Sequence, residues 1–319
     1  MAHNLNSMMY TGDKPWHGLG TKVESAQTSA DAIISAGLNW QVLQSPVQYI
    51  NGTQLITNSK HRVNYRSDNG AMLGIVGDGY NVLQNSQAFS FFDAIVGVKE
   101  AMYHTAGALG AGERIWLLAK LPGYIRTVGD DVTEKYLLLS TSHDGSSSVH
   151  VMFTPIRVVC QNTLNVAIGS ASNRVKVRHT LNMGARIGDI QKDLGIINQR
   201  FTIFEDATKQ LAMKQVTREA LQGFIKTSGL VPKETEQTEG MSTRASNIME
   251  EVSRLFEYGK GSDLEGSKGT LWGAFNAVVE YVDHQRGGED LGKRTNSLLY
   301  GSGSLIKQQA FKNALELAK

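Results

Sequence analysis

Three stretches of sequence decide the fold of this chain: RIWLLAKL at 114–121, KYLLLSTS at 135–142 and SVHVMFTPIRVV at 148–159. Each run is rich in leucine, β-branched and aromatic residues, and each is bounded by Gly, Pro, Asp or Ser, which is typical of strands separated by turns. The connections between the runs are short enough to join antiparallel neighbours. The three runs therefore predict a central antiparallel β-meander.

Two hairpins are expected before this meander. Asn51 and Gly52 lie between apolar runs, and a tight two-residue turn needs positive φ, which these residue types tolerate. A second turn is expected at 67–70, which is Ser-Asp-Asn-Gly, between two further apolar runs. Residues 86–96 then show apolar residues at helical spacing and predict a short amphipathic helix. The first half of the chain is therefore expected to be rich in strands.

The second half changes to a helical period. From residue 185 to residue 211, apolar residues repeat at alternating intervals of three and four, which predicts a long helix with a narrow apolar seam. The seam fits packing within the chain, and it also fits a contact between subunits. Three further helices are expected, each with Ser or Thr at its start as a cap, at 243–258, 270–285 and 304–318.

These patterns predict an α+β fold in which an antiparallel β-meander sheet is packed by a long helix and is followed by a helical C-terminal region. The boundaries expected are a core domain at 1–228, a flexible linker at 229–242 and the C-terminal helical region at 243–319. The linker is predicted because this stretch is polar and contains Gly229 and Pro232.

Composition narrows the class of protein. The chain has 319 residues, of which 41% are hydrophobic and 19% charged, so it can bury a sizeable core. Its longest apolar runs are far shorter than the roughly 20 residues that a membrane helix needs, so no membrane partner is expected. The single Cys160 cannot form an internal disulfide. A cytoplasmic protein is therefore expected.

The charge is uneven although the net charge is only +2. No carboxylate occurs between Gly145 and Gly188, a window that contains five cationic residues. Such a window is typical of a surface that attracts a polyanion, although a solvated basic loop gives the same pattern. The residues expected to contact nucleic acid in or near this window are Arg157, Asn162, Thr163, Arg174, Lys176, Arg178, His179 and Arg186.

Two features near the C-terminus extend this prediction. Gly301–Ser304 precedes a helix that contains Lys307, so backbone amides and a lysine are expected to meet a DNA phosphate there. Ordinary helix capping explains the same residues. Trp272 and Phe275 precede several cations and suit stacking on single-stranded bases, but they also share a helical face with valines and fit a core position.

An enzyme is the alternative interpretation. A hydrolase or nuclease site would be built from a polar group comprising His17, His143, Asp144, Cys160, Asn162 and His179. Cys160 also fits a buried structural thiol, since it ends a β-branched run. The spacing of His143, Asp144 and His150 matches no zinc pattern, and no phosphate-binding loop of the Walker type occurs. We therefore expect no metal and no cofactor.

Several short motifs resemble those of the phage/plasmid-like protein family, which is catalogued as domain of unknown function 932. The resemblance covers most of the chain and rests on Pro15–Gly20, His143–Ser146, Arg157–Leu164, Arg178–Thr180, Gly269–Ala274 and Tyr281–His284. It implies a role in the DNA metabolism of mobile elements. The order of a meander followed by a long helix is also similar to the single-strand annealing proteins of phages and of the eukaryotic Rad group.

Together these features predict a protein that binds and anneals single-stranded DNA in recombination or replication. The similarity to annealing proteins implies a homo-oligomer, in the form of a ring or a filament. Annealing is downhill once two strands are held extended, so the absence of an ATP-binding loop fits this interpretation.

Overall fold

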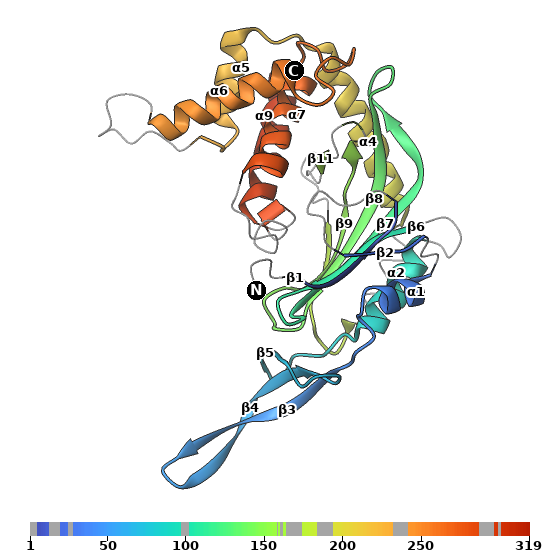
Figure 1. Cartoon of the computed structure of the whole chain (residues 1–319), viewed down its shortest axis with the longest axis vertical. Helices are drawn as coiled ribbons and strands as arrows, with labels where there is room; N and C mark the ends of the chain where they lie inside the picture. The colour runs from blue at the N-terminus through green and yellow to red at the C-terminus, as the bar shows by residue number, and fades with distance from the viewer. Residues whose placement is uncertain are drawn as a thin grey trace. The chain divides into compact units, whose positions relative to one another are not determined.

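The computed structural model confirms the α+β class, with helices and sheets both well represented. It describes residues 5–12, 20–24, 28–96, 102–157, 159, 162–163, 174–183, 194–231, 242–286, 297–298 and 301–319. Figure 1 shows these elements in chain order.

The chain forms two compact units, and both are discontinuous in sequence. The first unit comprises 1–122, 136–152 and 174–195, and the second comprises 123–135, 153–173 and 196–319. The long strands β7 (Arg114–Arg126) and β8 (Val132–Ser142) contribute residues to both units. The predicted linker at 229–242 lies mostly outside the described residues.

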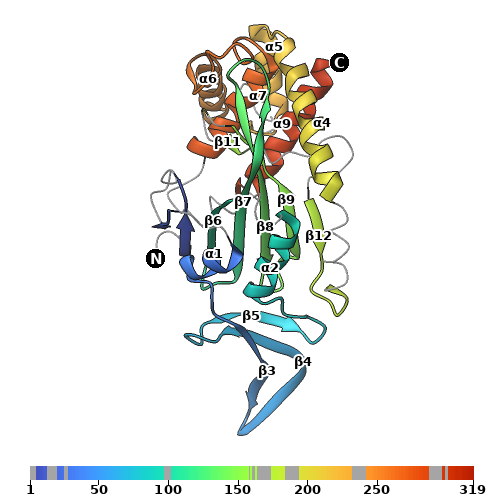
Figure 2. The same ribbon diagram turned by 90° about the vertical axis from the view of Figure 1, so that its right-hand side faces the viewer.

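The main sheet of the first unit grows outward from β7 and β8. Strand β6 (Met102–Leu109) pairs antiparallel with β7 and with β1 (Leu5–Tyr10), and β1 pairs in parallel with the two-residue β2 (Thr21–Lys22). On the other side, β8 is followed by β9 (Val149–Phe153) and then by β12 (Arg174–Val177). The helices of this unit, seen beside the sheet in Figure 2, are α1 (Ser29–Ser35) and α2 (Asn85–Val96).

Polar contacts connect the helices of the first unit to its sheet. Asp93 of α2 accepts hydrogen bonds from the backbone N–H of Ser29 at 3.2 Å, from the Ser29 hydroxyl and from the Tyr103 hydroxyl of β6. Burial, followed by the hydrogen bond to Asp93, raises the pKa of Tyr103. Helix α1 begins after Thr28, whose hydroxyl accepts from the Asp31 N–H as an N-cap should. These contacts fix the helices against one face of β6.

The first unit also contains a separate three-stranded sheet. Strands β3 (Val42–Asn51), β4 (Gln54–Arg66) and β5 (Met72–Gly77) pair antiparallel in that order. Both predicted hairpins are confirmed, although the first loop is Gly52-Thr53, one residue later than expected. Gly52 has φ +62°, which a residue without Cβ adopts at little cost. Because β3 and β4 extend beyond the last pairing with β5, residues 47–60 form a long ribbon, the arm, seen in Figures 1 and 2.

The second unit is mainly helical. Its elements are α4 (Leu194–Met213), α5 (Arg218–Thr227), α6 (Thr243–Tyr258), α7 (Leu271–Glu280), the π-helical turn η1 (Tyr281–Gln285), α9 (Ser302–Ala318) and the short strands β10 (Ile156–Arg157) and β11 (Asn162–Thr163). The expected long helix is described from Leu194 onward, because 184–193 lie outside the described residues.

An aromatic cluster forms the core of the second unit. The ring of Phe153 lies 4.4 Å from that of Phe201 and 5.6 Å from that of Phe204, both on α4. Phe204 in turn stacks on Phe311 of α9 at 5.6 Å, and Phe311 meets Phe275 of α7 at 5.2 Å. All five rings are buried. Burial of this much aromatic surface stabilises the packing of α4, α7 and α9 against one another.

Helix capping follows the predicted chemistry at two of three sites. The hydroxyls of Ser242 and Thr270 accept hydrogen bonds from the first turns of α6 and α7. Helix α9 differs, because its N-cap is Gly301 and no side chain caps it. Its start is instead supported by Ser297, whose hydroxyl accepts from the Gly303 N–H at 3.2 Å.

None of the helices that the structure describes is long and apolar enough to span a bilayer.

A buried carboxylate stabilises the junction between the start of β8 and α7 within the second unit. Asp131 is fully buried, and its Oδ2 accepts from Trp272 Nε1 at 2.7 Å and from Ser267 Oγ at 3.2 Å. Asp130 beside it is the opposite case, since its side chain is 99% exposed and lies 3.9 Å from Arg126. The pair offers a matched comparison.

We expect Asp131→Ala to lower the free energy of unfolding by about 2–4 kcal/mol, because it removes the acceptor from two buried donors. Asp130→Ala should change it by less than about 0.5 kcal/mol, since exposed ion pairs contribute little. Urea denaturation of both variants measures the difference. Equal effects would show that the buried carboxylate does not stabilise the unit.

Candidate nucleic-acid interface

Strand β12 presents two cations at the edge of the main sheet. Its four residues pair with β9, Val177 opposite Val149 and Lys176 opposite His150. Since successive side chains of a strand point to opposite faces, Val177 is buried while Lys176 and the following Arg178 are exposed. The alternation of the sequence therefore places both cations on the same solvent-facing side.

Lys176 and Arg178 are available to a ligand. Neither forms an ion pair with any residue in the part of the chain that the structure describes. Other surface cations differ: Lys209 lies 2.7 Å from Glu205, and Arg254 lies 2.6 Å from Glu251. A cation without a carboxylate neighbour gains more when it meets a phosphate, because no existing pair has to break.

His179 fixes the end of this segment. Its Nε2 lies 3.1 Å from Thr141 Oγ1, its Nδ1 lies 3.3 Å from the Asn81 carbonyl, and its ring stacks on Tyr80 at 4.6 Å. The Asn81 N–H also donates to the His179 carbonyl at 3.1 Å. Burial lowers the pKa of His179. The sequence predicts that His179 contacts nucleic acid, but the residue is buried, so that contact does not fit the structure. His179 instead anchors the end of the segment that carries Lys176 and Arg178.

The remaining predicted residues fall into two groups. Arg157 pairs through its backbone with Asn162 and Thr133, and Thr163 pairs with Ile156, so these residues belong to β10 and β11 of the second unit. Arg174 begins β12 opposite Met152 in the first unit. Arg186 lies outside the described residues. The structure thus places Arg174, Lys176 and Arg178 on one short segment of the first unit, and Arg157, Asn162 and Thr163 on two short strands of the second.

Lys307 is not a surface residue. Its side chain is 0% exposed, and Nζ lies 2.8 Å from Oδ1 of Asp283, which is itself only 4% exposed. The sequence predicted a phosphate contact because Lys307 follows Gly301–Ser304 at a helix start. The structure removes Lys307 from the residues predicted to contact nucleic acid, since a buried, paired ammonium cannot reach a DNA backbone. Trp272 and Phe275 are likewise fully buried, so the core interpretation holds for both.

Strand β4 contributes cations that the sequence prediction missed. No carboxylate occurs between Ala32 and Ser67, and within this stretch Lys60 and Arg62 are exposed and form no ion pair with a described residue. Two backbone hydrogen bonds connect this region to β12: the Asp78 N–H donates to the Lys60 carbonyl, and three residues later the Asn81 N–H donates to that of His179, each at 3.1 Å. The sequence carries the same signal here as in the second half, a long stretch without carboxylates.

The polar group of the enzyme interpretation is only partly described. His17 and Cys160 lie outside the described residues. His143 is fully buried, with Nε2 2.9 Å from Asn85 Oδ1 and its ring edge against Trp40 at 5.6 Å. Its Nδ1 has no hydrogen-bond partner among the described residues. Such a histidine is held as part of the core, where a substrate has no access.

The neighbouring Asp144 stabilises a turn. Its Oδ1 accepts from the Ser146 N–H at 2.8 Å, which closes the connection between β8 and β9. Although burial raises the pKa of Asp144, hydrogen bonds from Ser146 and Ser142 together lower it below its usual value. Within the described ranges, no group of three His, Cys, Asp or Glu side chains is arranged to hold a metal ion.

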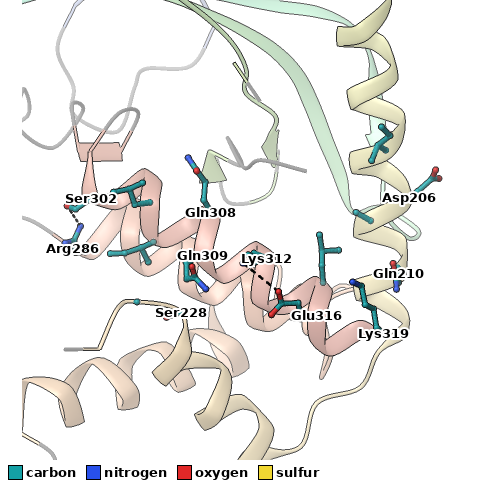
Figure 3. Close-up of a pocket in the computed structure, with 16 residues that line it drawn as sticks. Asp206, Gln210, Ser228, Arg286, Ser302, Gln308, Gln309, Lys312, Glu316 and Lys319 are labelled. Atoms are coloured by element: carbon teal, nitrogen blue, oxygen red, sulfur yellow. Dashed lines mark hydrogen bonds and ion pairs between the residues drawn. The ribbon is translucent and has the colours of Figure 1, made fainter. Parts of the chain in front are cut away.

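A groove of about 1080 Å³ lies on the second unit, between α9, α4 and the residues Ser228 and Gly229 that follow α5 (Figure 3). Apolar side chains including Ile203 and Leu305 line it, and its charged residues have both signs: Asp206 and Glu316 beside Lys312, Lys319 and Arg286. Lys312 and Glu316 lie 3.9 Å apart. A mixed rim does not favour a polyanion over other ligands, so the β12 segment is the better candidate for nucleic acid.

A family model described as Domain of unknown function (DUF932) matches residues 72–310. No curated protein and no solved structure matches the chain. The matched region includes β12, the helices from α2 to α7 and about half of α9, but it begins at the first residue of β5, after β3 and β4.

The burial of His143 predicts a loss of stability in acid. Burial lowers its pKa to about 3, and the charge of His179 acts in the same direction. The unfolded chain binds a proton near pH 6.5, so it holds more protons than the folded protein between about pH 6.5 and pH 3. Stability should therefore fall by about 2 kcal/mol on acidification from pH 7 to pH 5.

Urea denaturation at the two pH values measures this loss. His143→Gln should lose the contribution of His143 and keep that of His179, whose pKa burial also lowers, whereas His61→Gln, at an exposed position of β4, should keep the full pH dependence. The same pH dependence in His143→Gln would show that other groups are responsible.

Lys307→Gln should lower the free energy of unfolding by about 3–5 kcal/mol, because it removes one member of a buried ion pair. Lys312→Gln on the same helix removes an exposed cation and should change the free energy by less than about 0.5 kcal/mol. Urea denaturation compares the two. A small effect at Lys307 would indicate that its ammonium reaches solvent, as the sequence had predicted.

Proposed function

The chain belongs to the family described as Domain of unknown function (DUF932), whose description names no reaction, and we propose that it binds and anneals single-stranded DNA in the recombination or replication of a phage or plasmid. The observation that carries the proposal is the pair of exposed cations, Lys176 and Arg178, which have no ion-pair partner among the described residues at the edge of the main sheet.

Phosphate contacts supply the affinity in this proposal. Lys and Arg that meet phosphates release condensed counterions, and this release gives sequence-independent binding that weakens with salt. Lys176 and Arg178 lie two residues apart, a spacing of about 6–7 Å along an extended strand, which is close to the distance between successive phosphates of an extended single strand. Lys60 and Arg62 of β4 add two more exposed cations to the first unit.

Annealing follows from binding without a further reaction. Two strands repel each other through their phosphates, and a protein that neutralises part of this charge while leaving bases exposed lowers the barrier to pairing. Base pairing then supplies the driving force, so no nucleotide hydrolysis and no catalytic group is required. The reaction needs only a cationic surface that holds the backbone and leaves the base edges free.

The biological setting and the assembly belong to the same proposal. The short motifs similar to the phage/plasmid-like family support a role in a mobile element, within a cytoplasm. The order of an antiparallel meander and a long helix, similar to single-strand annealing proteins, supports a homo-oligomer in the form of a ring or filament. In such an assembly, the β12 segments of successive subunits would line one continuous path for the strand.

Neutralising both cations by Lys176→Gln and Arg178→Gln should weaken binding to a labelled single-stranded oligonucleotide. Each phosphate that is no longer neutralised should reduce the slope of log K against log salt by about 0.7, so the slope of the double variant should fall by about 1.4. Fluorescence anisotropy across a salt series measures both quantities. Annealing of complementary labelled strands should slow in parallel.

The control removes the same charge elsewhere. Lys226→Gln with Arg244→Gln replaces one exposed lysine and one exposed arginine of the second unit. This variant should keep the wild-type slope. Equal effects in the two double variants would show that binding depends on net charge and not on the β12 segment. Wild-type binding by the β12 variant would overturn the proposal.

A further inference from the structure

The outer face of the three-stranded sheet is apolar and open. Cross-strand register places Leu43, Tyr65 and Met72 in one row and Ser45, Val63 and Ile75 in the next, all on the same face. Met72 is 59% exposed and Ile75 is 53% exposed. In an ordinary two-layer domain, this face would be covered by another element.

The inner face of the same sheet is fixed in place. Asn64 is buried and donates to the His143 carbonyl at 2.6 Å. Arg66 donates to both carboxylate oxygens of Asp68, at 2.9 and 2.7 Å, and to the Ala111 carbonyl at 2.9 Å. Its guanidinium also lies over the Trp40 ring at 4.5 Å. The open outer face therefore belongs to a rigid element of the first unit.

The arm beyond this sheet is exposed on both faces. Tyr49 pairs with Ile56 on one face, and Ile50 pairs with Leu55 on the other. Tyr49, Ile50 and Leu55 are 51%, 75% and 64% exposed. A ribbon of two strands is marginally stable in water by itself, and contiguous exposed apolar surface is unusual unless it binds something. The length of the ribbon indicates that a partner stabilises it.

Charge identifies the kind of partner. The two outer rows contain no side chain that is charged at pH 7, and the cation Arg62 lies in the opposite row with Pro46 and Val76. A polyanion would require cations on the contact face. An isologous contact places identical patches together, so any net charge on it would repel itself. An uncharged apolar patch meets a copy of itself without that cost.

Size is also consistent with a self-contact. The two outer rows contain six residues and the arm, residues 47–60, contains fourteen, so the surface reaches the lower end of the roughly 20–30 residues that a stable protein interface involves from each partner. Apolar faces of this kind are typical of homodimer interfaces.

We propose that the outer face of β3, β4 and β5, together with the arm, is a homotypic docking surface for a second copy of the chain. Each copy covers the apolar rows of the other, and the two arms pack along one another. The inference gives the proposed homo-oligomer an isologous contact that joins its subunits in pairs, and a ring or filament would need a second, different contact. It is tested without nucleic acid, so its failure would leave the DNA-binding proposal standing.

The test places charge on the surface. Met72→Lys with Ile75→Lys adds two like charges to each copy at positions that are already half exposed, so the fold should persist. Sedimentation or light scattering of wild type should give a multiple of the 34.8 kDa monomer mass, and the double variant should shift to the monomer or to a smaller assembly. Unchanged thermal melting below the assembly concentration confirms that the subunit is folded.

The matched control is Ile34→Lys with Met213→Lys, an exposed isoleucine and an exposed methionine elsewhere, which should assemble as wild type does. A second experiment mixes the double variants M72K/I75K and M72E/I75E. Each should be impaired alone, and the mixture should recover association because opposite charges now face one another. A monomeric wild type, an assembling M72K/I75K variant or a mixture that does not recover would each overturn the proposal.

Discussion

The candidate site depends on one constraint, the strict alternation of side chains along a strand at the edge of a sheet. Because β12 pairs with β9, burying Val177 forces its neighbours outward, and Lys176 and Arg178 become the solvent-facing residues of the edge. His179 then ends the segment in a fixed position through Thr141, Asn81 and the stack on Tyr80. A one-residue slip of this ladder would bury the cations and expose the valine.

Cations of this protein have different roles according to their surroundings rather than their residue type. Lys307 is buried against Asp283, Lys209 and Arg254 are paired at the surface, and Lys176 forms no ion pair within the described structure. An exposed pair contributes little to stability, whereas a buried pair is costly to break. The three settings thus separate structural lysines from those available to a ligand.

Local patterns predicted much of the fold. The α+β class, both hairpins and the N-caps at Ser242 and Thr270 followed from residue types and spacing, since these are local preferences. Division into units was not predictable in this way, because β7 and β8 each supply residues to both. For the candidate site, the sequence around β12 predicts the alternation of buried and exposed side chains. The sequence does not predict the burial of Lys307, since its partner Asp283 lies 24 residues away and only packing brings the two together.

One glycine shapes how the arm can vary. At Gly74 of β5, an added Cβ would lie 2.7 Å from the Cα of Asp144, so the backbone of the arm's root lies directly against the β8–β9 turn. This position tolerates no side chain, whereas a Cβ at Gly52 in the tip would meet nothing within 4 Å. Residues inserted as opposed pairs at the tip would lengthen the ribbon by about 3.4 Å per pair without disturbing its anchorage. The length of the arm can therefore vary while its attachment to the first unit stays the same.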